Sequence, residues 1–183
     1  MAIPLSRRLD FSEIPVIDVG PLVSGDRAGA GATIAALDAA CRDVGFFYVR
    51  RHGVDRVLVE RLVAEAVRFF RLPDEQKLAS ALDPRMRGFI PTKYRSYEGE
   101  ARAGTSHQEA FWVGRETPPS AANYFDGPNP WPAAQPGLRP AMMDYFAAVE
   151  RLSLALLEGF GAALGLGRDF FRPWFLKPNS RLK

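Results

Sequence analysis

The sequence contains a single cysteine and no long run of apolar residues. Because Cys41 has no second cysteine to pair with, an internal disulfide is excluded, which agrees with a reducing compartment. No stretch approaches the roughly 18 consecutive apolar residues that read as a membrane-spanning helix. The opening MAIPLSRRLDF lacks the apolar segment of a secretory signal peptide. We therefore expect a cytoplasmic protein that does not associate with membranes.

A surplus of charge of one sign is also missing. The chain has 24 Lys and Arg against 21 Asp and Glu, a formal net charge of +3. The basic residues are scattered, so the sequence lacks the dense basic patch typical of nucleic-acid binding. Hydrophobic residues make up 47% of the chain, which is enough to bury a core. Nucleic acid is therefore not an expected partner.

Residues that carry chemistry are few. His52 and His107 are the only histidines. Cys41 falls on the apolar face of an expected helix, so we predict a small core residue there. The sequence has no G-x-S-x-G motif, and the glycine-rich stretch 25–31 lacks the lysine of a phosphate-binding loop. Nucleophilic and phosphate chemistry are therefore not indicated.

Helix and strand patterns alternate along the first half of the chain. Apolar residues at steps of three and four predict helices, and short β-branched or aromatic runs predict strands. Asp55 is the expected N-cap of the second helix, and Pro73 the expected start of the third. The expected elements are a strand at 14–18, a helix from 32 to 44, a strand at 45–49, a helix at 55–70 and a helix from 73.

The second half has a different composition. Residues 83–104 predict loop with short extended pieces, and 109–113 predict a strand. The proline-rich stretch 117–140 predicts an irregular connection with Tyr124, Phe125 and Trp131 as apolar anchors. A long helix is expected from Met142 to Ala163, ended by Gly165 and Gly167. A short helix at 169–175 and the start of a strand at 180–183 follow.

Six short motifs occur in an order that is informative as a set. They are IPVID (14–18), GFFYV with HGV (45–49 and 52–54), FFRLPDEQK (69–77), RGF (87–89), EAF (109–111) and NPWP (129–132). Together they resemble the N-terminal region of the iron- and 2-oxoglutarate-dependent dioxygenases of the isopenicillin N synthase type.

The resemblance implies a fold and a domain organisation. The expected class is α+β: the N-terminal helical and strand portion of a double-stranded β-helix (jelly-roll) oxygenase, with the barrel core largely absent. Residues 1–116 would form the non-haem dioxygenase N-terminal domain. Residues 117–183 would hold the proline-rich connection, the long helix and the start of the truncated jelly-roll core.

The resemblance also implies cofactors that this sequence does not provide for. A complete family member would bind Fe(II) through His-x-Asp and a later His, and 2-oxoglutarate through an R-x-S motif. The chain contains no such set, so we expect no catalytic, cofactor-binding or metal-binding residue and no cofactor in this chain alone. His107, Glu109 and His52 offer one alternative ligand set, because His107-Gln108-Glu109 has H-x-E spacing. Against it, His52 precedes the pair, and Glu109 matches a structural glutamate of the family.

A substrate wall is the contribution that the N-terminal part of such an enzyme can make. The loop that resembles the family's pocket-lining segment contains Arg87, Phe89, Tyr94 and Tyr97, our candidate substrate-binding residues. An arginine there could pair with a substrate carboxylate. A solvated loop arginine is the alternative interpretation.

Two functions follow from the sequence. In the first, the chain is the N-terminal part of an oxygenase that oxidises a small organic substrate once a C-terminal half completes it, and it is not catalytic alone. In the second, it is a non-catalytic interaction module or remnant that dimerises or binds a partner. Self-association would then use the apolar surface left exposed where the barrel would pack.

Overall fold

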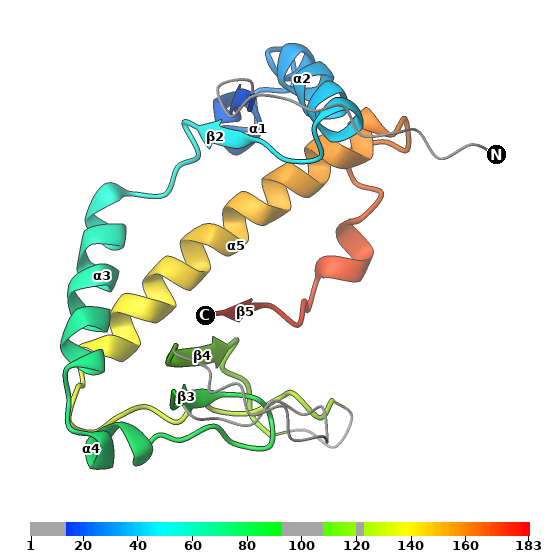
Figure 1. Cartoon of the computed structure of the whole chain (residues 1–183). Coiled ribbons are helices and arrows are strands. Elements are labelled where there is room, and N and C mark those ends of the chain that lie inside the picture. The colour runs from blue at the N-terminus through cyan, green and yellow to red at the C-terminus, as the bar shows by residue number, and fades with distance from the viewer. Residues whose placement is uncertain (1–13, 93–107, 120–122) are drawn as a thin grey trace. The chain divides into compact units, whose positions relative to one another are not determined.

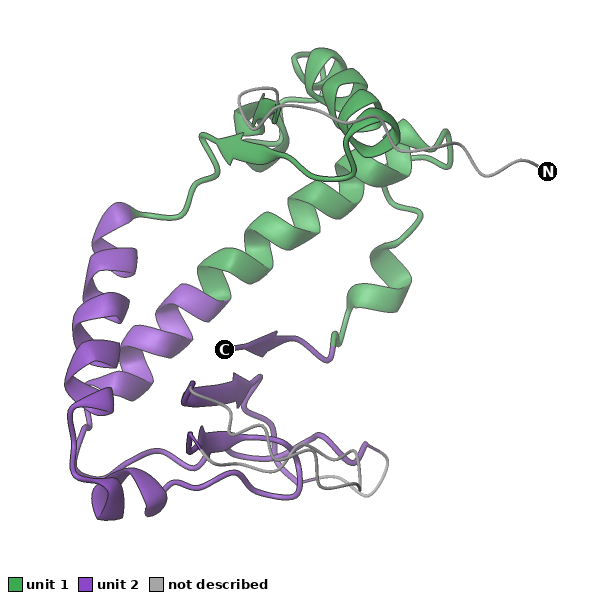
Figure 2. Ribbon diagram, viewed as in Figure 1, with its two compact units in different colours: residues 1–55, 147–178 green, residues 56–146, 179–183 purple. Residues whose placement is uncertain are grey.

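The computed structural model describes residues 14–92, 108–119 and 123–183. It divides into two compact units, coloured separately in Figure 2. Unit 1 comprises Met1–Asp55 and Ala147–Pro178, and unit 2 comprises Arg56–Phe146 and Asn179–Lys183. The long helix α5 (Leu138–Ala163) contributes its first nine residues to unit 2 and the rest to unit 1.

Unit 1 contains a parallel strand pair connected through two helices (Figure 1). Strand β1 (Val16–Asp18) pairs with β2 (Tyr48–Arg50), and α1 (Gly20–Val23) and α2 (Ala30–Asp43) lie between them in sequence. The hydroxyl of Thr33 on α2 donates to the carbonyl of Asp18 at 2.8 Å. The core contains Ile17, Val19, Leu22, Ala30, Leu37 and Ala40, with Leu152, Leu156 and Phe160 of α5 packed against it. A short 3-10 helix, η2 (Arg172–Phe175), follows α5.

The prediction for Cys41 was wrong. The buried stripe of α2 runs through Ala30, Thr33, Leu37 and Ala40, and Cys41 is exposed. The four-residue step from Leu37 indicated burial, but Cys41 lies at the edge of the stripe. The small Ala40 occupies the contact instead, and helical spacing alone does not decide between these two neighbours.

Unit 2 packs helices against an antiparallel sheet. Its elements are α3 (Arg56–Phe70), α4 (Asp74–Leu78), β3 (Gly88–Ile90), β4 (Ala110–Gly114), the start of α5 and β5 (Arg181–Leu182). The sheet order is β3-β4-β5, with Phe89 opposite Phe111 and Val113 opposite Leu182. Phe69 of α3 forms the centre of the core, with edge-on ring contacts to Phe89 at 5.7 Å and Phe111 at 4.9 Å. The strands expected at 109–113 and 180–183 are therefore confirmed.

The long helix and the irregular connection before it are also confirmed. Helix α5 begins at Leu138, so Pro140 falls in the first turn, where no helical hydrogen bond is lost. Gly165 and Gly167 take positive φ angles of 71° and 88° just beyond its end. Tyr124 is 62% exposed, so the prediction that it is an apolar anchor was wrong. Its hydroxyl donates to the carbonyl of Pro84 instead.

The described residues combine helices with short strands and contain no closed barrel. No helix in the described ranges is long and apolar enough to cross a membrane.

Candidate functional site

The β3-β4-β5 sheet of unit 2 has one apolar face and one face that carries arginines. Side chains alternate along a strand, so Phe111 and Val113 of β4 and Leu182 of β5 enter the core. Trp112 lies between Phe111 and Val113, and Arg181 is next to Leu182, so both side chains point to the other face. Their contact confirms this, since the Arg181 guanidinium carbon lies 5.9 Å from the Trp112 ring centre.

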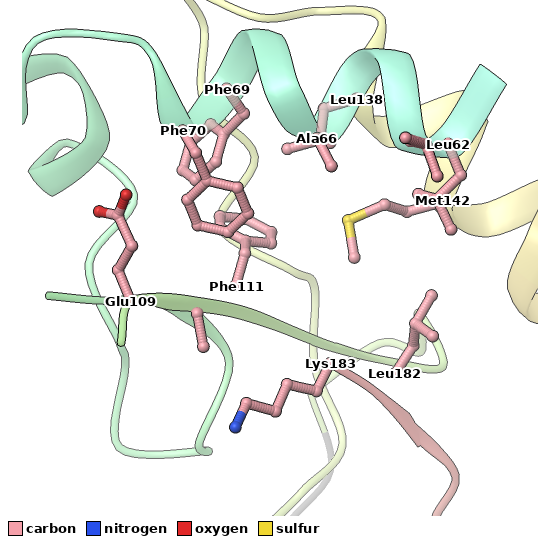
Figure 3. A pocket seen from close by; sticks show the side chains of 12 residues that line it. Leu62, Ala66, Phe69, Phe70, Glu109, Phe111, Leu138, Met142, Leu182 and Lys183 are labelled. Atoms are coloured by element: carbon pink, nitrogen blue, oxygen red, sulfur yellow. The ribbon is translucent and has the colours of Figure 1, made fainter. Parts of the chain in front are cut away.

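The apolar face borders a cavity of about 450 Å³ within unit 2 (Figure 3). Phe69 and Phe70 approach it from α3, Leu138 and Met142 from α5, and Phe111 from β4. Glu109 and Lys183 are the charged residues in its lining. A volume of this size matches small-molecule pockets in general. The lining is hydrophobic and offers few polar groups to orient a ligand.

Glu109 is held by a buried lysine. The Lys77 ammonium lies 2.8 Å from Glu109 Oε2 and 3.0 Å from Asp74 Oδ1, and the Lys77 side chain is only 7% exposed. It also lies 5.2 Å from the centre of the Phe89 ring. Burial lowers the pKa of Lys77, but hydrogen bonds to Glu109 and Asp74 outweigh it, so its pKa lies above the ordinary value. The pair connects α4 to the residue that precedes β4.

Arg87 lies at the centre of a buried polar network. Its Nη1 donates to the Arg115 carbonyl and to Asn129 Oδ1, each at 3.0 Å, and its Nη2 donates to the Phe125 carbonyl at 2.6 Å. Asn129 in turn pairs with both backbone groups of Gly114, at 2.9 and 3.0 Å. Arg87 is 5% exposed. It therefore fastens the proline-rich connection to the end of β4.

The pKa of Arg87 is below its ordinary value. Burial is the largest cause, the carboxylate of Asp83 opposes it, and the positive charge of Arg181 lowers the pKa further. Arg87 and Arg181 therefore place two positive charges close together on this face of the sheet.

The backbone at position 88, directly after Arg87, requires a glycine. Its φ is +115°, a conformation that side-chain-bearing residues rarely adopt. A Cβ at this position would lie 2.5 Å from the Ala81 carbonyl oxygen and 2.6 Å from that of Ser80. This close approach lets the Phe89 amide donate to Ser80 at 2.7 Å while the Phe89 ring enters the core.

Arg181 differs from Arg87 in being exposed. Its guanidinium carbon lies 4.5 Å from the centre of the Phe125 ring, in addition to its contact with Trp112. Within the described ranges it has no ion pair with a carboxylate. The indole N–H of Trp112 is buried and has no acceptor in the described part of the chain. Among the described residues, an arginine without an ion pair therefore lies against an indole whose N–H has no acceptor.

The residues that the structure describes do not fit a mononuclear iron. No group of three or more His, Cys, Asp or Glu side chains in these ranges could hold a metal ion. His52 Nδ1 accepts the Val54 amide at 3.1 Å in a turn of unit 1, and the Glu109 carboxylate is bound by Lys77 in unit 2. His107 lies outside the described residues. The described residues therefore provide no ligand set for iron.

The predicted substrate residues have different outcomes. Arg87 and Phe89 are both buried in unit 2, one bound to carbonyl and amide oxygens and one in the core. Tyr94 and Tyr97 lie outside the described residues, so substrate contact stays a prediction for this loop. Sequence reasoning missed Arg181 and Trp112. The alternating patterns of the two expected strands could have placed them on one face.

Comparisons with known proteins agree with these features. The family model described as "non-haem dioxygenase in morphine synthesis N-terminal" matches residues 14–134. A homoarginine 6-hydroxylase of Arabidopsis thaliana is 32% identical over 168 residues, covering 85% of this chain and 46% of the relative. A 2-oxoglutarate-dependent dioxygenase of Aspergillus niger is 31% identical over 162 residues, covering 84% and 48%. The chain thus spans about half the length of the curated relatives it matches.

Solved structures show the same fold. A 2OG-Fe(II) oxygenase family protein from Caulobacter crescentus superposes with a TM-score of 0.72 at 24% identity, covering 88% of this chain and 52% of that one. This likeness places the described elements within the fold of the 2-oxoglutarate and iron oxygenases.

Proposed function

Since this chain belongs to the non-haem dioxygenase N-terminal family, we propose that it forms the N-terminal half of an iron- and 2-oxoglutarate-dependent oxygenase. The complete enzyme oxidises a small organic substrate, and residues 1–183 alone are not catalytic. The proposal rests on two observations together. The chain matches the N-terminal region of the family, and its described residues offer no iron site. In this proposal Lys77, Arg87 and Gly88 stabilise unit 2.

In this proposal the chain contributes a scaffold and a wall. The Lys77–Glu109 pair and the Arg87–Asn129 network hold the β3-β4-β5 sheet and the proline-rich connection in place. The arginine-bearing face of that sheet is then the surface offered to a substrate. Iron and 2-oxoglutarate would be held by residues outside this chain. In the family that the chain resembles, these residues are the Fe(II) ligands and the R-x-S motif.

The first test is turnover. Purified chain 1–183 with Fe(II), ascorbate and 2-oxoglutarate should form no succinate above the protein-free control. The coding sequence extended past the Lys183 codon should encode His-x-Asp, a later His and R-x-S, and its product should form succinate. Replacing the first of those histidines by alanine should abolish turnover. Succinate formation by residues 1–183 alone, or a stop codon with no such motifs, contradicts the proposal.

One observation favours the second candidate, a self-associating module. Val59, Val63 and Val67 recur every four residues along α3 and are 38%, 56% and 43% exposed. Such an apolar stripe is a typical contact surface. Light scattering after size-exclusion chromatography should show dimers or larger species that Val63→Lys reduces. The exposed Arg71→Lys is a control that leaves the stripe intact. A monomer at all concentrations argues against this candidate.

A further inference from the structure

Arg181 is presented to solvent on an aromatic platform. Its guanidinium carbon lies 4.5 Å from the Phe125 ring centre and 5.9 Å from that of Trp112. Contact between a guanidinium and ring faces holds the side chain in one orientation and leaves its N–H edge free to donate. The strand register supports the same placement, because Arg181 lies opposite Gly114 in β4, where no side chain intervenes.

The platform is braced from beneath by Arg87. Arg87 Nη2 donates to the Phe125 carbonyl at 2.6 Å, which fixes the backbone that carries the Phe125 ring. A Cβ on Gly114 would lie 2.9 Å from Arg87 Nη2, so Arg87 lies on the same face of the sheet as Arg181. The buried Arg87 guanidinium is hydrogen-bonded to carbonyl and amide oxygens, whereas in the described part of the chain the exposed Arg181 guanidinium is not.

The nearby carboxylates are already engaged. Asp83 accepts the Arg87 amide and faces Arg85 at 3.7 Å, and Glu116 is bound by Arg139 at 2.7 Å. Asp126 accepts from the Asn123 amide at 3.2 Å. Within the described residues, Arg181 forms no ion pair and lies beside the buried indole N–H of Trp112, which has no acceptor there.

We propose that Arg181, held on the rings of Phe125 and Trp112, binds the carboxylate of a small substrate that also carries an apolar group. The guanidinium fork matches a planar carboxylate with two parallel hydrogen bonds, and the adjacent rings provide contact for the apolar group. Arg87 is a positioning residue for this site. The inference rests on the proposed function, because the carboxylate belongs to the substrate of the complete oxygenase.

The test measures binding by residues 1–183 without iron or turnover. The chain has three tryptophans, so its ¹⁵N–¹H spectrum has three indole signals, from Trp112, Trp131 and Trp174. Phenylacetate should shift the Trp112 signal saturably and leave the Trp174 signal in place. Its neutral counterpart phenylacetamide should bind about tenfold more weakly, because it lacks the charge that the guanidinium recognises.

Matched variants separate the site from general charge. Arg181→Gln should weaken phenylacetate binding about tenfold or more, and Arg181→Lys should restore only part of it. Arg172→Gln removes the same charge from an exposed arginine of unit 1 and should bind as the parent does. Unchanged Trp131 and Trp174 signals show that each variant is folded.

Three results would overturn the inference. They are no saturable shift of the Trp112 signal in the parent, equal binding of the acid and the amide, and unchanged affinity in Arg181→Gln. Tighter binding of 2-oxoglutarate than of phenylacetate would assign the carboxylate to the co-substrate and overturn the substrate assignment. Because succinate formation is measured separately, failure of this binding test and failure of the proposed function are distinguishable.

Discussion

Replacing Gly88 by alanine should destabilise unit 2 more than the matched replacement of Gly127. Both glycines have positive φ, +115° and +155°. An alanine Cβ at position 88 would meet the backbone oxygens of Ala81 and Ser80 at 2.5 and 2.6 Å, which cannot move without breaking the turn. At position 127 it would meet only the Arg85 side chain, at 3.0 Å, and that chain can swing away.

The magnitudes can be worked from these contacts. Backbone strain costs about 1–3 kcal/mol, and overpacking against rigid backbone costs about 1–3 kcal/mol more. Gly88→Ala should therefore lower the free energy of unfolding by about 2–6 kcal/mol. Gly127→Ala should lower it by about 1 kcal/mol. Urea unfolding followed by tryptophan fluorescence measures both. Equal losses in the two variants would refute the argument that close backbone approach requires this glycine.

Three further predictions concern buried or half-buried polar groups of unit 2. Burial raises the pKa of the Glu116 carboxyl, but hydrogen bonds from Arg139 and Trp131 outweigh it and place the pKa below 4.5. The stability that Glu116→Gln removes should thus be present above pH 4.5 and vanish as pH falls through the folded pKa. A difference in melting temperature that grows on acidification would contradict this prediction. Lys77→Met should cost about 3–5 kcal/mol by leaving the Glu109 carboxylate unpaired, and Glu109→Leu added to it should recover a large part, which a double-mutant cycle in urea measures. Asn129→Leu should cost about 2–4 kcal/mol, because it leaves both backbone groups of Gly114 without partners; faster amide exchange at Gly114 would confirm that cause.

The element types could be predicted from local pattern. The helical spacing from Met142 to Ala163 predicted α5, and the aromatic run at 109–113 predicted β4, because neighbouring residues alone determine which face of a helix or strand is apolar. The ends were less accurate. Helix α2 begins at Ala30 and β2 at Tyr48, since capping and pairing decide where an element stops.

The candidate site was predictable only in part. The motif at 87–89 directed attention to the correct sheet, but not to the difference between its two arginines. Arg87 is buried because Arg115, Phe125 and Asn129 supply oxygens from 28 to 42 residues away. The rings that Arg181 contacts come from β4 and the proline-rich connection. Neither environment is encoded near the arginine itself.

By itself, the sequence determined the family and the order of helices and strands. These depend on short-range pattern and on motifs in a set order. Only the tertiary structure decided that Lys77 and Glu109 form a buried pair, that Cys41 is exposed and that Arg181 has no ion pair among the described residues. Burial and pairing depend on segments far apart in the chain that folding brings together, and the spacing of residues does not specify which of them meet.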